Sequence, residues 1–244
     1  MSFMMYVVRH GQPAKEEDGY TVKQDPQLSD LGLEQADCVA EQFERWGGLD
    51  AIYSSSLLRA MQTAQPIYHR LQVPWHVWPS LCETGRREWP LMRKLQGEGG
   101  YETHLAAETM KRHGLNEHYP SLTRLQLQYP GIRIEQPYPW PEAWYPELAA
   151  ETRERCYDRA ERSIAAICES HMGTEARVAV VCHGAFGSVL MNALLSGTPC
   201  DHIRFHQAHA AISLVEVADN GTAALHFLNH VNHMPLDKIT EGSR

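Results

Sequence analysis

Short apolar runs alternate along the chain with longer segments in which apolar residues recur every three or four positions. Runs of about 4–8 residues that are rich in Val, Ile and aromatic side chains are typical of buried strands. Two of these runs flank Asp219-Asn220-Gly221, a sequence that predicts a turn between two closing strands. The predicted strands are Phe3–Val8, Leu49–Tyr53, Trp75–Trp78, Arg177–Cys182, Ala211–Val217 and Ala223–Leu228.

Amphipathic segments follow several of these strands. A helix is expected from Ser29, whose hydroxyl can cap it, to about Trp46, and Gly47 stops it. Strands that alternate with helices predict an α/β fold, a three-layer sandwich around a mostly parallel sheet. The other expected helices are Leu57–Arg70, Pro146–His171 with Gly173 as its stop, and Gly184–Leu195.

Residues 84–150 differ in composition from the rest of the chain. They hold half of the 14 prolines and half of the 6 tryptophans, but few aliphatic residues that could build a separate core. We therefore expect one domain, residues 1–244, in which an insertion at about 84–150, helical and aromatic, forms a lid over the edge of the sheet.

The charge balance limits the partners of the protein. The net charge of −8 disfavours nucleic acid, because nucleic-acid binding depends on neutralising phosphates. The chain has 17 Arg but only 5 Lys, which either serves anion binding or reflects the composition of the source genome.

The six cysteines show no CxxC spacing, and MSFMMYVVRHG at the start is neither a signal peptide nor a membrane span. We expect a cytoplasmic protein with no membrane partner.

Two predicted strands end in the same dipeptide, His-Gly. The first continues into Arg9-His10-Gly11, and the second into His183-Gly184. In parallel α/β sheets ligands bind beyond the carboxyl ends of the strands, and glycine lets the backbone pass close to a ligand. His183 also opens a helix, whose free N–H groups attract anions. The pattern predicts an anion site at this end of the sheet.

Five segments of the chain resemble the histidine phosphatase superfamily, whose members are also called phosphoglycerate mutase-like proteins. Their order and spacing match that family over about residues 4–89 and 176–233, and the aromatic middle is unmatched. The segments are VVRHGQ at 7–12, LSDLGLEQA at 28–36, YSSSLLRAMQTA at 53–64, LCE at 81–83 and VVCHG at 180–184.

The resemblance implies a role for each of five residues. His10 would be the nucleophile that becomes phosphohistidine, and Glu83 would protonate the leaving oxygen and then activate water. Arg9, Arg59 and a protonated His183 would hold the three non-bridging oxygens of the phosphoryl group. Neutral imidazole can attack near pH 7, and forked guanidinium groups stabilise the charge that develops during phosphoryl transfer.

Other residues have two open interpretations. Gln12 either touches phosphate or substrate, or serves only its loop, and Glu88 or Glu98 could act in place of Glu83. Ser29, Gly32 and Gln35 are interpreted as capping and packing residues. The resemblance places His209 near the pocket. His226, His230 and His233 invite a metal interpretation, which their placement on a strand and loop disfavours.

The family that the chain resembles includes both phosphatases and mutases. The mutases of that family usually continue the first motif with Glu-Thr and a nearby Asn, whereas this chain has Gln12-Pro13-Ala14. Residues 84–89 stand where those mutases have a Tyr-Gly-rich segment. We therefore expect a phosphatase that hydrolyses a small phosphorylated metabolite without a metal or other cofactor. Mutase-type transfer and phospho-ligand binding without turnover are the alternatives. A homodimer is left open.

Residues 84–150, the aromatic insertion, are expected to select the substrate. They carry Arg86, Arg87 and Arg93 directly after the predicted acid. Arg86 is included among the predicted substrate-binding residues because an arginine here could hold a second anionic group of the substrate. A side flap that merely stabilises the sheet is the alternative.

Overall fold

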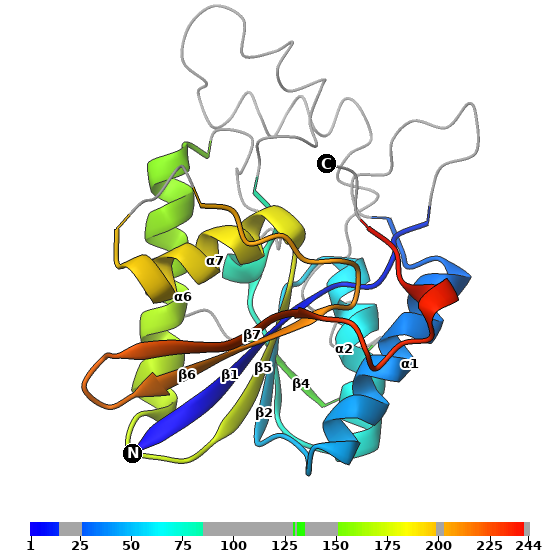
Figure 1. The fold of residues 1–244 in the computed structure, drawn as a ribbon, viewed down its shortest axis with the longest axis horizontal. Coiled ribbons are helices and arrows are strands. Elements are labelled where there is room, and N and C mark those ends of the chain that lie inside the picture. The colour runs from blue at the N-terminus through cyan, green and yellow to red at the C-terminus, as the bar shows by residue number, and fades with distance from the viewer. Residues whose placement is uncertain (15–25, 85–128, 130, 135–150, 199–202, 242–244) are drawn as a thin grey trace, which may run out of the picture.

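A seven-stranded sheet forms the centre of the protein in the computed structural model, which describes residues 1–14, 26–84, 129, 131–134, 151–198 and 203–241 (Figure 1). The strand order is β4-β3-β2-β5-β1-β6-β7. The strands are β1 (Ser2–Arg9), β2 (Ala51–Ser54), β3 (Trp75–Val77), β4 (Ile132–Ile134), β5 (Arg177–Cys182), β6 (Ile212–Ala218) and β7 (Ala223–His230).

Most of the strands run in one direction. β1, β5, β2, β3 and β4 pair with one another in parallel, whereas β6 runs antiparallel to both β1 and β7. The turn between β6 and β7 includes Gly221, whose φ of 82° lies in the left-handed region that glycine favours. The predicted α/β fold with a mostly parallel sheet is confirmed.

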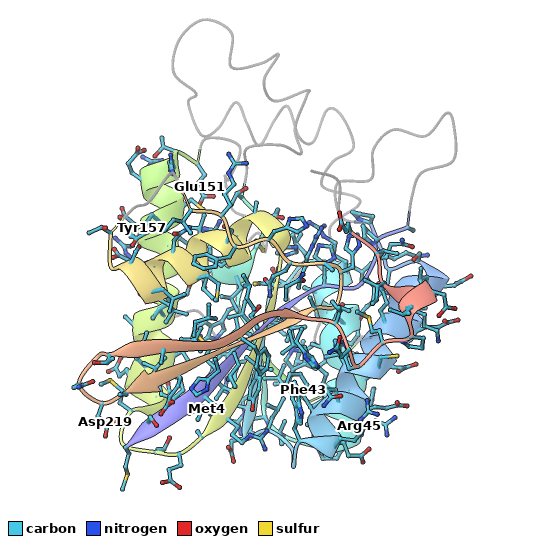
Figure 2. The ribbon with its side chains drawn as sticks, viewed as in Figure 1. Met4, Phe43, Arg45, Glu151, Tyr157 and Asp219 are labelled. Carbon is cyan, nitrogen blue, oxygen red and sulfur yellow. The ribbon has the colours of Figure 1, made fainter. Side chains whose placement is uncertain are left out.

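Helices cover both faces of the sheet (Figure 1). Alternate residues of β1 point to opposite faces, as the period of a strand requires. Phe3, Met5 and Val7 pack on the side of α6 (Arg153–His171) and α7 (Gly184–Ser196). Val8 packs on the other side with α1 (Asp30–Arg45) and α2 (Leu58–Leu71), where Figure 2 labels Phe43 between α1 and the sheet. These two cores give the predicted three-layer sandwich.

Most predicted elements are present with small differences at their ends. The side chain of Ser29 accepts the N–H of Gly32, so Ser29 is the N-cap of α1 as expected. The predicted start of the long helix at Pro146 is wrong. α6 begins at Arg153, because Thr152 has an extended backbone and its hydroxyl oxygen accepts the N–H of Arg155.

The predicted insertion lies mostly outside the described residues. Its residues 132–134 form β4, a short edge strand parallel to β3 that was not among the predicted strands. Two short 3-10 helices, at Pro79–Leu81 and Leu236–Lys238, complete the described elements. The described residues contain no helix that is long and apolar enough to cross a membrane.

Candidate active site

The carboxyl ends of β1, β2 and β5 meet at one edge of the sheet. Because these strands are parallel neighbours, the residues that follow them are hydrogen-bonded across the sheet. The N–H of His10 donates to the carbonyl oxygen of Cys182, and the N–H of Ser55 donates to that of Val181. The rings of His10 and His183 lie 5.1 Å apart between centroids. The two His-Gly motifs therefore share one site.

Hydrogen bonds define which nitrogen of His10 carries the proton. Nδ1 lies 2.7 Å from the carbonyl oxygen of Gly11, and a carbonyl oxygen can only accept, so Nδ1 is protonated. The Nε of Arg59 donates to Nε2 of His10 at 3.2 Å, and guanidinium can only donate. Nε2 therefore carries the lone pair, as a nucleophile in this position requires.

The surroundings of His10 keep its imidazole neutral. The residue is 4% exposed, and burial lowers its pKa well below the ordinary value, with further lowering by the charges of Arg59 and Arg9. Neutral imidazole at physiological pH is the form that can attack phosphorus.

Arg9 is held in place by two acceptors. Its Nη1 donates to the carbonyl oxygen of Gln207 at 2.6 Å, and its Nη2 donates to Nε2 of His209 at 3.2 Å. Nδ1 of His209 then carries its proton and donates to the hydroxyl of Thr240 at 2.9 Å. Burial and the charge of Arg9 lower the pKa of His209 to about 3. His209 thus orients the guanidinium of Arg9 near His10, since the ring centroids of His10 and His209 lie 5.8 Å apart.

Arg59 reaches the site from the first turn of α2, and its side chain is 3% exposed. One turn later, the hydroxyl of Thr63 donates to the carbonyl oxygen of Arg59 and accepts the N–H of Gly11 at 3.0 Å. α2 is thereby attached to the loop that carries His10, so the backbone of Arg59 is held close to that loop.

His183 is fully buried and pairs with Ser55. Its Nε2 lies 2.8 Å from the Ser55 hydroxyl, whereas its buried Nδ1 has no hydrogen-bond partner among the described residues. Burial lowers the pKa of His183 well below the ordinary value, and the charges of Arg59, Arg159 and Arg9 lower it further. Burial and three arginines therefore disfavour a protonated His183 in the protein without a bound anion, and its predicted role toward a phosphoryl group stays a prediction.

Glu83 binds the N-terminal end of α7. Its Oε1 accepts the N–H of Phe186 at 2.8 Å and that of Thr84 at 2.9 Å, and its Oε2 accepts the N–H of Ala185 at 3.4 Å. The N-cap residue His183 supplies no side-chain hydrogen bond to this helix, so the Glu83 carboxylate caps its free N–H groups.

The two glycines of the His-Gly motifs make room for protein groups. A Cβ atom on Gly11 would lie 2.5 Å from the carbonyl oxygen of Gly32, so Gly11 permits close packing against α1. A Cβ atom on Gly184 would lie 3.2 Å from Nε and Cζ of Arg9. Packing against α1 and against Arg9 is therefore a further reason for these glycines, and the close approach of the backbone to a ligand stays a prediction.

Gln12 is bound to the start of α1. Its Oε1 accepts the hydroxyl of Ser29 at 2.8 Å, and its N–H donates to Oε1 of Gln35 at 2.8 Å. This geometry favours the loop role over contact with substrate. Arg86, Arg87, Arg93, Glu88 and Glu98 lie outside the described residues, and their predicted roles stay predictions.

The three C-terminal histidines are engaged in other contacts. Nε2 of His226 lies 2.8 Å from the carboxylate of Glu216. The rings of His230 and His233 are stacked at 5.6 Å, and Nε2 of His233 donates to the carbonyl oxygen of Ala210. In the part of the chain that the structure describes, no three His, Cys, Asp or Glu residues are grouped to hold a metal ion.

Comparison with known proteins identifies the family. The sequence profile of the histidine phosphatase superfamily (branch 1) matches residues 5–118 and 104–230. The chain belongs to this superfamily. No curated protein sequence matches the chain.

Solved structures share the histidine phosphatase fold at low sequence identity. Phosphoserine phosphatase from Entamoeba histolytica, in complex with 3-phosphoglyceric acid, is 19% identical with a TM-score of 0.58 over 95% of this chain and 98% of its own. The α-ribazole phosphatase from Shigella flexneri is 23% identical, with a TM-score of 0.59 over 93% and 96%. Mycobacterial glucosyl-3-phosphoglycerate phosphatase, in complex with VO3, is 21% identical, with a TM-score of 0.59 over 94% and 100%. These likenesses confirm the fold.

Some residues of the candidate site were not predicted from the sequence. Ser55 lies in the segment YSSSLLRAMQTA that carries the resemblance, but it received no role there, although its position just after β2 was a usable signal. Gln207 and Thr240 fix Arg9 and His209 from distant parts of the chain, and no sequence pattern marks them.

Proposed function

We propose that the protein is a metal-independent phosphatase that hydrolyses a small phosphorylated metabolite through a phosphohistidine on His10. One observation carries the proposal: His10 is buried and neutral, with Nδ1–H bound to the Gly11 carbonyl oxygen and the Nε2 lone pair directed at the cation Arg59. An anionic phosphoryl group attracted by Arg59 would reach this lone pair. Membership of the superfamily supports the same chemistry.

In the first step, Nε2 of His10 attacks phosphorus and the bond from phosphorus to the ester oxygen breaks. The positive charge that develops on the imidazole is stabilised by Nδ1–H donating to Gly11. The negative charge spreads over the non-bridging oxygens, which Arg9 and Arg59 would bind through their forked donors. The dianion would also favour the protonated form of His183, opposing the effect of burial.

The leaving oxygen takes a proton from Glu83, which would have to be protonated at that stage. Glu83 lies close enough to Arg9 for its charge to raise the pKa of that guanidinium against the effect of burial. In the second step, the Glu83 carboxylate accepts a proton from water, whose oxygen attacks phosphorus and breaks the bond to Nε2 of His10. The products are inorganic phosphate and free imidazole.

Hydrolysis is favoured over transfer to a second substrate by the sequence after His10. The first motif continues as Gln12-Pro13-Ala14, and the side chain of Gln12 accepts a hydrogen bond from Ser29, the N-cap of α1. The substrate class stays that of a small phosphate monoester, and the protein is expected to act in the cytoplasm without nucleic-acid or membrane partners.

The decisive experiment compares His10→Ala with wild type. If the protein is a phosphatase, we expect wild-type protein to release 4-nitrophenol from 4-nitrophenyl phosphate and to carry acid-labile phosphate after rapid quenching. The His10→Ala variant should lose both the release and the labelling. His226→Ala, which removes an exposed histidine paired with Glu216, is the matched control and should keep both. Binding of phosphate by wild-type protein without turnover would instead indicate a binding protein.

A further inference from the structure

Arg159 is a buried arginine of α6 that takes no part in the reaction steps above. The side chains of Arg159 and its ion-pair partner Glu151 are each 6% exposed. Nε and Nη2 of Arg159 donate to the two carboxylate oxygens of Glu151 at 2.7 and 2.9 Å. Nη1 donates to the carbonyl oxygens of Ser80 at 2.7 Å and Cys82 at 2.8 Å. Figure 2 shows Glu151 beside the N-terminal end of α6.

These contacts link Arg159 to the two parts of the protein that hold Glu83, the backbone before it and the N-terminal end of α7. Ser80 and Cys82 belong to the backbone that leads directly to Glu83. The Cζ atom of Arg159 also lies 4.2 Å from the ring centroid of Phe186, the residue whose N–H donates to the Glu83 carboxylate at 2.8 Å. The guanidinium therefore contacts the chain before Glu83 and the helix end that binds its side chain.

The arrangement requires an arginine. Burial alone lowers the pKa of Arg159, but the hydrogen bonds and charge of Glu151 raise it above its usual value, so the side chain is permanently charged. Three nitrogens directed at four oxygens match the planar fork of guanidinium and not the single ammonium of lysine. A buried ion pair is weak evidence for stability, since apolar residues of similar volume often stabilise a protein as well. The directed contacts point to another role.

We propose that Arg159 and Glu151 form a clamp that positions Glu83 for proton transfer to the leaving group. This inference rests on the role of Glu83 in the proposed function. Proton transfer needs the carboxyl group within hydrogen-bond reach of the ester oxygen, and small misplacements of a reacting group reduce rates strongly. Arg159 and Glu151 are thus positioning residues, which do not contact the reacting atoms.

The test uses two substrates of similar size whose leaving oxygens differ in basicity. Phenyl phosphate needs protonation of its leaving group more than 4-nitrophenyl phosphate does, because 4-nitrophenolate is stable as an anion. The main variant is Arg159→Met with Glu151→Met, which replaces the buried pair by apolar side chains and removes the contacts to Ser80 and Cys82. We expect its kcat/KM to fall about 10-fold to 100-fold for phenyl phosphate and less than about threefold for 4-nitrophenyl phosphate.

Two companion variants make the result decisive. Glu83→Gln should show the same selective loss. If Glu83→Gln keeps the wild-type ratio of the two substrates, the acid assignment in the proposed function fails. Arg177→Met is the matched control, since Arg177 also donates to a backbone carbonyl oxygen, that of Trp46, but lies at the opposite end of β5 from His183. It should keep the wild-type ratio.

The clamp is overturned if Glu83→Gln loses phenyl phosphate selectively while the double variant, folded by circular dichroism, loses both substrates equally or neither. If the double variant does not fold, Glu151→Gln is measured in its place. That change keeps the shape of the side chain but sets an amide N–H against a guanidinium N–H, so the same selective loss is expected and an unchanged ratio overturns the proposal.

Discussion

Nε of Arg59 donates a hydrogen bond to Nε2 of His10 across 3.2 Å, so a permanent cation lies against the lone pair of the proposed nucleophile. After burial, the charge of Arg59 is the largest cause that lowers the pKa of His10. Phosphate oxygen is a stronger acceptor than neutral imidazole, so the guanidinium can turn to the substrate and release the lone pair. The contact thus keeps His10 both neutral and available.

Removal of this cation should change both the rate and its pH dependence. In Arg59→Met we expect kcat/KM for 4-nitrophenyl phosphate to fall by about 10²-fold to 10³-fold, because a group that stabilises transition-state charge is lost. Since Arg59 lowers the pKa of His10, its removal raises that pKa, and the acidic limb of the kcat/KM profile should move to higher pH. Arg59→Lys keeps a positive charge and should show a smaller displacement of the limb. A limb that stays in place in Arg59→Met would argue that His10 does not titrate there.

Ser55 should control the second histidine of the site. Its hydroxyl can donate to or accept from Nε2 of His183, so it can serve the neutral and the protonated imidazole alike. Ser55→Ala would leave that buried nitrogen without its partner, at a cost of about 1–3 kcal/mol that falls on phosphate binding and on the transition state. We expect weaker inhibition by inorganic phosphate and a kcat/KM about 10-fold lower or more. Unchanged phosphate inhibition would separate His183 from the phosphate pocket.

Much of this architecture could be predicted because local patterns determine it. Within the strand Arg177–Cys182, Val178–Cys182 is a continuous apolar run, and both of its faces are buried in the structure. The start of α1 followed from the capping hydroxyl of Ser29. The two His-Gly motifs could be predicted to lie close together, because neighbouring parallel strands end at the same edge of the sheet.

The sequence does not reveal the contacts between residues that are distant in the chain. Arg9 and Gln207 are 198 residues apart, and Arg159 reaches Ser80 across 79 residues. Such pairs depend on how helices and loops are arranged in space, which periodicity cannot encode. The start of α6 was placed too early because Pro146 is a suitable first helical residue, whereas the capping hydroxyl of Thr152 defines the end that forms.

Metal independence is testable with a chelator and a transition-state analogue. Among the described residues, Arg9 and Arg59 are positive groups of the site, and His183 can become charged when an anion binds, so we expect full turnover after dialysis against EDTA. Vanadate, which imitates five-coordinate phosphorus, should inhibit competitively and bind less tightly to Arg59→Met. Loss of turnover on chelation that zinc, magnesium or manganese restores would contradict the metal-free mechanism.

Buried histidines should make the folded protein sensitive to acid. Burial, followed by the charge of His230, lowers the pKa of His233 to about 4, and the pKa of His209 lies at about 3. Between these values and about 6.5, the ordinary value, the unfolded chain binds protons that the folded protein does not bind. The stability contributed by each histidine is therefore complete above about pH 6.5 and is lost as the pH falls toward its folded-state pKa, by about 1.4 kcal/mol per pH unit.

His233→Asn isolates one of these contributions at a residue away from the proposed chemistry. His233 donates from Nε2 to the carbonyl oxygen of Ala210, and the side-chain amide of asparagine can also donate. Urea unfolding at pH 7.0, 6.0 and 5.0 should show that the variant is less stable than wild type at pH 7.0. Because the variant lacks one group that takes up a proton on unfolding, its free energy of unfolding should fall by about 1.4 kcal/mol less per pH unit between pH 6 and 5. Parallel pH dependences for the two proteins would show that His233 titrates alike in the folded and unfolded states, contrary to its burial.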